Sequence, residues 1–146
     1  MKKIALLVVA FIGFATAASA QTFDLGTNNI TATLGFGSGN AIPVTVSYEY
    51  GILDFGGDHK LGLGGNALFY SSIFGLAAEC NYHYVGVEKL DLYGGVRLGV
   101  AMFNGGSDLF NSFDIGANYY FDPAWAINAE FGSKVSSISL GITHKF

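Results

Sequence analysis

Three histidines and two serines are the residues that could support acid–base or nucleophilic catalysis. Such chemistry needs a nucleophile within hydrogen-bonding reach of a base, and an acid that orients the base. His59 lies in a stretch rich in Gly and Asp, which is typical of a turn, and His83 lies between two tyrosines. His144 alternates with Ser137 and Ser139, which places it on the opposite face of a predicted strand. We therefore expect no catalytic residue and no enzymatic activity.

Charged side chains form a second set, because they recur inside otherwise apolar, alternating stretches. A buried charge must be paired or hydrated. The shared face of these stretches predicts a polar network of Glu49, Glu79, Asp91, Arg97, Asp114, Glu130 and Lys145. We expect Arg97 to bridge two or more of Glu49, Glu79, Asp114 and Glu130. The alternative is a narrow passage that prefers cations and is lined by the excess of acids.

Metal and cofactor chemistry has little support in the sequence. Cys80 is the only cysteine, so it cannot form an internal disulfide, and its alternation with Ala78 and Tyr82 is typical of a small hydrophobic residue. His, Cys and Asp nowhere show the spacing of a structural zinc site. The glycine-rich stretch 62–65 lacks the Lys-Ser pair and the helix of a phosphate loop. We expect neither a metal nor a cofactor.

The elements that must position these residues are strands, because apolar and polar residues alternate with period two along most of the chain. Gly, Asn, Asp and Pro separate the alternating runs. The pattern predicts eight strands, at 30–37, 44–52, 61–70, 74–84, 90–103, 113–121, 125–131 and 137–146. Their lengths are near the roughly 9–11 residues of a tilted membrane strand. We expect the last strand to pair with the first and close a barrel.

Composition and the first residues indicate export to a membrane. The chain is 51% hydrophobic and 12% charged, against about 25% charged in an average soluble protein. Lys2 and Lys3 precede an apolar run that ends at Ala18 and Ala20, which predicts a signal peptide at 1–20 and a mature chain from Gln21. No later stretch of the sequence is apolar enough for a membrane helix, so a closed barrel is expected. A mature net charge of −6 argues against nucleic-acid binding.

Aromatic residues cluster near the strand ends, where two girdles would meet the membrane interfaces. At the ends that we expect to face the periplasm, the outward set is Tyr48, Tyr50, Tyr82, Tyr84, Tyr119, Phe121, Trp125 and Phe146. The opposite ends carry Phe36, Phe69, Phe74, Phe113 and Phe131. The inward faces are rich in Gly, Ser, Thr and Asn, which are poor residues for a soluble surface.

Several stretches carry a family resemblance: 44–54 (VTVSYEYGILD), 82–95, 118–132 and the terminal 140–146 (LGITHKF). They resemble small outer-membrane β-barrel proteins of Gram-negative bacteria, the porin-family or outer-membrane-protein-X-like barrels. The resemblance implies an eight-stranded up-and-down barrel, and a terminal Phe146 that the barrel-insertion machinery reads. The family's outer loops are often long and carry its binding roles. Here the expected loops 38–42, 71–73, 105–111 and 133–136 are short, which argues against adhesion through long loops.

The fold class predicted from these observations is all-β: an eight-stranded antiparallel transmembrane β-barrel at 21–146, whose lumen is filled by side chains. We expect an integral outer-membrane protein with a structural or envelope-related role. The alternatives are a narrow passive channel for small solutes or cations, a lipid A-modifying enzyme, and a soluble secreted lipocalin-like barrel. The expected partners are outer-membrane lipid, lipopolysaccharide and the barrel-insertion machinery, with no nucleic acid, and the expected state is a monomer.

Overall fold

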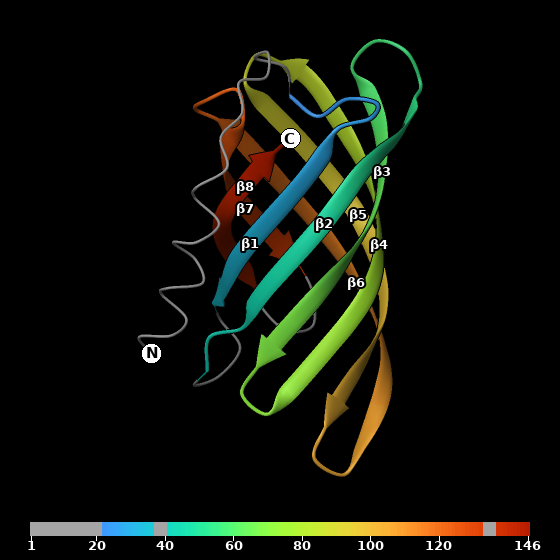
Figure 1. Cartoon of the computed structure of the whole chain (residues 1–146), viewed down its shortest axis with the longest axis vertical. Helices are drawn as coiled ribbons and strands as arrows, with labels where there is room; N and C mark the ends of the chain where they lie inside the picture. Colours follow the sequence, from blue (N-terminus) through green and yellow to red (C-terminus); the bar gives the residue numbers. More distant parts are fainter. Residues whose placement is uncertain (1–21, 37–40, 133–136) are drawn as a thin grey trace.

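The structure, a computed structural model, describes residues 22–36, 41–132 and 137–146. The predicted signal peptide 1–20, its cleavage residues Ala18, Ala20 and Gln21, and the predicted loop 133–136 lie outside the described residues, as does most of the predicted loop 38–42. Within the described part no helix is long and apolar enough to cross a membrane. The described chain is a sequence of eight strands (Figure 1): β1 Asn28–Phe36, β2 Val44–Asp54, β3 His59–Tyr70, β4 Ile73–Val87, β5 Leu90–Phe103, β6 Gly106–Tyr120, β7 Trp125–Gly132 and β8 Ile138–Lys145.

The strands form a closed barrel in which each pairs with its neighbours in the sequence. Every pairing is antiparallel, and β8 pairs with β1 from Lys145 opposite Asn29 to Ile138 opposite Phe36. The predicted fold class and the predicted closure of the barrel by its last strand are therefore confirmed. The backbone N–H of Asn28 also donates to the carbonyl of Phe146, so both described ends of the barrel wall lie together. We call this the terminal end, and the opposite one the hairpin end.

The strand boundaries differ from the prediction most at the β5–β6 hairpin. The sequence predicted a loop at 105–111 and a strand from residue 113, whereas β6 begins at Gly106 and pairs opposite Phe103 across a two-residue turn. Gly105 makes this turn with a φ of 110°. Pairing of β6 with β7 begins only at Asp114, so the hairpin projects beyond the rest of the wall, as Figure 1 shows. The predicted loop at 105–111 is therefore wrong.

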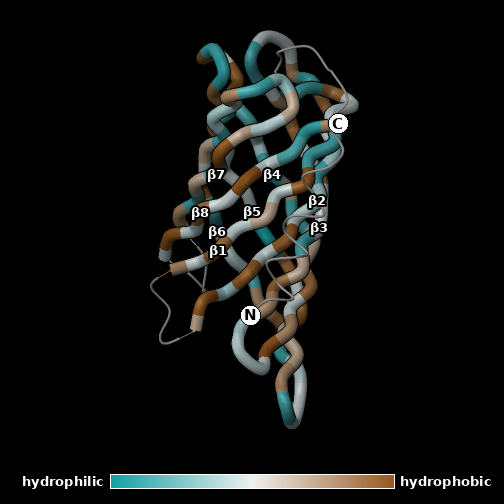
Figure 2. Tube along the Cα trace, turned by 60° about the vertical axis from the view of Figure 1, so that its left-hand side comes forward, coloured by the Kyte–Doolittle hydropathy of each residue, from teal (hydrophilic) through white to brown (hydrophobic). Residues whose placement is uncertain are grey.

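The two faces of the wall have opposite chemistry. Large apolar side chains on the outer face are exposed along all eight strands, from Leu34 on β1 to Ile142 on β8. Polar and charged side chains on the inner face are buried, from Asn29 on β1 to Lys145 on β8. The alternation of hydrophobic and hydrophilic residues is visible along the strands in Figure 2. A soluble barrel would bury the first set and expose the second, so this wall is built for lipid outside and a polar interior.

Candidate functional site

The centre of the lumen is a layer of four side chains built around Arg97, which we call the Arg97 layer. Arg97 lies in the middle of β5 and points inward. Its guanidinium donates from Nε to Glu79 Oε2 at 3.1 Å, from Nη1 to Asp114 Oδ1 at 3.1 Å and Glu130 Oε1 at 2.9 Å, and from Nη2 to Glu130 Oε2 at 2.8 Å. The carboxylates come from β4, β6 and β7. The planar guanidinium suits this role because its donors are fixed in a fork that matches carboxylate geometry.

A second cluster lies nearer the terminal end and is centred on His83, whose side chain is fully buried. Its Nε2 lies 2.9 Å from Glu49 Oε1 and its Nδ1 lies 2.8 Å from Asp91 Oδ1. Both ring nitrogens therefore face carboxylate oxygens, an arrangement that an imidazolium satisfies with two donors. The structure thus places Glu49 in this cluster, where it also accepts from Asn81, and not among the ion-pair partners of Arg97.

Amide and hydroxyl groups connect the two clusters. Asn118 donates to Asp91 at 3.1 Å, and its own oxygen accepts from Asn128 at 2.8 Å and from Thr143 at 2.9 Å. Asn128 also donates to the Tyr93 hydroxyl, which donates to Glu130 of the Arg97 layer. The described part of the lumen therefore contains a continuous hydrogen-bonded network contributed by most of the strands.

Little space remains inside this network. The cavity among the lumen side chains measures about 20 Å³, and it is lined by residues of both clusters, among them Glu49, Glu79 and Arg97. A space of this size holds about one water molecule. Gly116 shows how tightly the interior is filled, because a Cβ at that position would overlap the ring of Tyr93 on the neighbouring strand. The described part of the lumen is therefore closely packed.

The sequence analysis missed one contributor to the lumen, the segment before β1. We call residues 22–27 the N-terminal segment. Phe23 is 1% exposed and stacks on His83, with ring centroids 3.8 Å apart and an interplanar angle of 10°. The one local signal was a lone aromatic residue in a polar stretch, which does not specify a partner 60 residues away. Lys145 lies at the same end, with its Nζ 5.3 Å from the centre of the Tyr120 ring.

The eight residues predicted for the periplasmic girdle lie on the outer face near the terminal end. Seven are exposed: Tyr48, Tyr50, Tyr82, Tyr84, Tyr119, Phe121 and Phe146. Trp125 is half-buried against the ring of His144, at a centroid distance of 4.3 Å. The Tyr48 hydroxyl donates to Asn28 at 2.6 Å, and the Tyr82 hydroxyl bonds to His59 Nδ1. Tyrosine and tryptophan rings, which have a polar group at the tip, suit a membrane interface.

The candidate catalytic residues do not come together. His144 points outward between Trp125 and Phe146, whereas Ser139 on the same strand is buried on the inner face. His59 lies on the outer face beside Tyr82 and Tyr84. Among the described residues no group of three or more His, Cys, Asp or Glu side chains could hold a metal ion.

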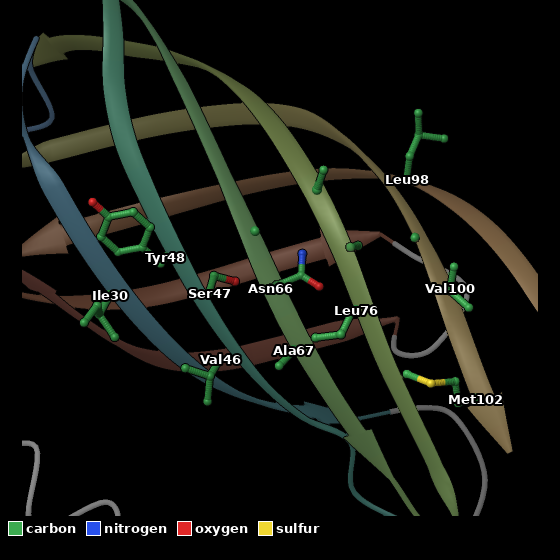
Figure 3. A pocket seen from close by; sticks show the side chains of 14 residues that line it. Ile30, Val46, Ser47, Tyr48, Asn66, Ala67, Leu76, Leu98, Val100 and Met102 are labelled. Atoms are coloured by element: carbon green, nitrogen blue, oxygen red, sulfur yellow. The ribbon is translucent and has the colours of Figure 1, made fainter. Parts of the chain in front are cut away.

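The outer face carries one broad hollow, shown in Figure 3. Its volume is about 770 Å³, and small residues of β3 and β4 form its floor: Gly65, Ala67 and Ala78. Larger side chains border it, among them Tyr48 on β2 and Leu98 on β5. The hollow faces the surroundings of the barrel, and the polar residues Ser47 and Asn66 are also among its lining residues.

Comparisons with known proteins agree with this architecture. No protein-family model matches the chain, and no curated protein matches it. A de novo designed transmembrane β-barrel is similar with a TM-score of 0.73 and 20% identity, over 85% of this chain and 98% of that one. The chain has the fold of a small transmembrane β-barrel.

Two natural barrels are also similar to this transmembrane barrel. The outer membrane protein Ail of Yersinia pestis, determined in a phospholipid bilayer nanodisc, has a TM-score of 0.56 and 15% identity, over 83% of this chain and 99% of Ail. The N-terminal β-barrel domain of Pseudomonas aeruginosa OprF has a TM-score of 0.56 and 17% identity, over 84% of this chain and 98% of that domain. At these identities the likeness shows the fold.

Proposed function

We propose that this barrel is an integral outer-membrane protein with a structural or envelope-related role and no open pore. The observation that carries the proposal is the filled lumen. Four hydrogen bonds hold three carboxylates on one guanidinium at its centre, and the cavity beside them is about 20 Å³. An eight-stranded barrel has an interior just wide enough for side chains to fill. We therefore expect the protein to act through its outer surfaces and not by conducting solutes through its lumen.

The outer-membrane location is supported by three features taken together. Exposed apolar side chains cover the outer face, a ring of aromatic residues surrounds the terminal end, and the natural barrels of similar fold are named as an outer membrane protein and a domain of OprF. An even number of strands puts both ends of the wall on one side, which in outer-membrane barrels is the periplasm. We accordingly place the terminal end in the periplasm and the hairpin end outside the cell.

The contact with lipopolysaccharide is expected to be made through acyl chains. Of the basic residues in the described ranges, Lys60 and Lys145 lie at the terminal end, Lys89 is in the turn before β5, and Arg97 is inside the lumen. The described part of the hairpin end therefore offers no cation to the lipid phosphates. The exposed apolar wall, in contrast, is continuous.

Fractionation with gel electrophoresis tests the location. We expect the protein in the outer-membrane fraction, with a faster-migrating band before heating than after it, because folded barrels resist denaturation by detergent. Recovery in the soluble fraction, with no heat-dependent shift in gel mobility, would contradict the proposed membrane location.

Planar-bilayer recording tests the closed lumen, and we expect no conductance steps above background. The acidic excess in the lumen favours cations, so the competing function is a narrow cation channel, and reproducible cation-selective steps would establish that function instead. A non-enzymatic role is tested separately by lipid A mass spectra, which we expect to be unchanged when the protein is overproduced.

A further inference from the structure

The N-terminal segment reaches into the barrel at its terminal end. Of its side chains only Phe23 is buried; Leu25 is 58% exposed, and Thr22, Asp24 and Thr27 are partly exposed. The Phe23 ring lies flat on the imidazole of His83, with the two ring centroids 3.8 Å apart. We propose that the N-terminal segment is a stopper that seals the terminal mouth of the lumen, with Phe23 as the sealing side chain.

The place that the ring covers explains why an apolar seal is useful there. His83 is held between Glu49 and Asp91, so the ring covers an ionic cluster that is buried with it. Electrostatic attraction within such a cluster is stronger when water is excluded, because the local dielectric constant falls. A ring lying face-on over a positively charged imidazole is also attracted to it through its quadrupole. The stopper therefore keeps the His83 cluster dry and holds its geometry.

The segment is fastened at the rim of the barrel by a small number of contacts. Asp24 Oδ1 lies 3.3 Å from Lys60 Nζ, the N–H of Gly26 donates to the carbonyl of Gly51, and the N–H of Gly51 donates to the carbonyl of Thr27. Gly51 is required for this approach, because a Cβ there would overlap the carbonyl oxygen of Asp24. The burial of Phe23 and these contacts at the rim together decide whether the mouth is open or closed.

The stopper and the Arg97 layer are then two barriers in series. Withdrawal of Phe23 exposes the terminal half of the lumen to water, down to the His83 cluster. The ion pairs of Arg97 in the described structure are made with Glu79, Asp114 and Glu130 and do not involve the N-terminal segment, so the Arg97 layer remains closed. Loss of the stopper should therefore change access from the terminal side without producing conductance, which separates this inference from the proposed function.

Thiol labelling of the folded barrel in lipid vesicles tests the stopper. The reporter is T143C in a C80A background, because the side chain of Thr143 is fully buried, faces the lumen and lies two residues before Lys145. A small water-soluble methanethiosulfonate is the probe. We expect F23A to be labelled about 10- to 100-fold faster than its parent, since burial of one phenylalanine side chain sets the ratio of closed to open forms.

The matched control is L25A, which truncates an exposed neighbour in the same segment and should leave the labelling rate unchanged. Labelling of F23A at the rate of its parent would overturn the proposal, as would equal acceleration by L25A. If F23A does not fold, the labelling rate of D24N tests the proposal, because this substitution removes the ion pair to Lys60 and leaves the Phe23 side chain in the protein. We expect D24N to accelerate labelling by less than F23A does in a folded barrel, and no acceleration at all would also overturn the stopper. Bilayer recording of F23A should show no conductance.

Discussion

Removal of the Arg97 guanidinium is the sharpest test of the lumen network. In R97M the side chain keeps a similar length, but the three carboxylates of Glu79, Asp114 and Glu130 lose their common partner. All three lie inside the barrel with little exposed surface. Removing one member of a buried ion pair typically costs about 3–5 kcal/mol, because an uncompensated charge is left behind. We expect the free energy of unfolding of R97M to fall by about that amount.

The measurement is urea unfolding of the barrel in lipid vesicles, followed by the fluorescence of Trp125, the single tryptophan of the chain. Trp125 lies at the terminal rim, so its emission reports the loss of the membrane-bound fold. The matched control is K89M, which removes an exposed charge in the turn between β4 and β5 and is expected to change stability by less than about 0.5 kcal/mol.

Two further variants show whether the cost comes from unpaired charge. R97K keeps the charge but has a single nitrogen in place of the fork, so it should be intermediate. Combining R97M with E79Q, D114N and E130Q removes the ionised groups together and should recover part of the loss. A stability of R97M within about 1 kcal/mol of the parent would refute the reasoning, since the three carboxylates would then not depend on Arg97.

Other substitutions test the packing and the membrane position of the wall. G116V places a side chain where the Tyr93 ring lies and should destabilise the barrel by about 1–3 kcal/mol in the same urea assay, whereas A117V on the outer face should be nearly neutral. L140R puts a charge on the lipid-facing side of β8 and should cost about 2–4 kcal/mol, measured by urea unfolding in vesicles. L109R lies on the projecting part of β6, where Leu109 is 80% exposed, and should cost only about 0–1 kcal/mol; equal costs for the two arginines would contradict a hairpin that extends past the bilayer.

The face of each residue could be predicted from the sequence because the side-chain period of a strand is two. Arg97 and Glu79 are inward and Leu98 and Ala78 are outward for the same reason, and no long-range information is needed. The pairing of β8 with β1 also followed, because a membrane barrel leaves no edge unpaired. These rules depend only on alternation and on the surrounding lipid.

The position of each residue along the barrel axis, and therefore its contact partners, could not be predicted in the same way. Glu49 shares the inward face with Arg97, but register brings it to His83, and alternation contains no information about register between distant strands. The stretch 104–111 is rich in Gly, Ser, Asn and Asp, which local composition assigns to a loop, although cross-strand hydrogen bonds with β5 make most of it strand. Phe23 is positioned by a ring on β4, so its role depends on the closed barrel.

The Arg97 layer also has a consequence for assembly. Its four side chains come from β4, β5, β6 and β7, and each must be in register with its neighbours for the guanidinium to reach all three carboxylates. If β6 slipped by one residue, Asp114 would turn toward lipid and Phe113 would turn into the lumen. A charged side chain on the lipid face lowers the stability of the barrel. The layer therefore disfavours strands that pair in the wrong register. The ion pairs of a single arginine thus favour the correct register of β4, β5, β6 and β7 as the barrel closes.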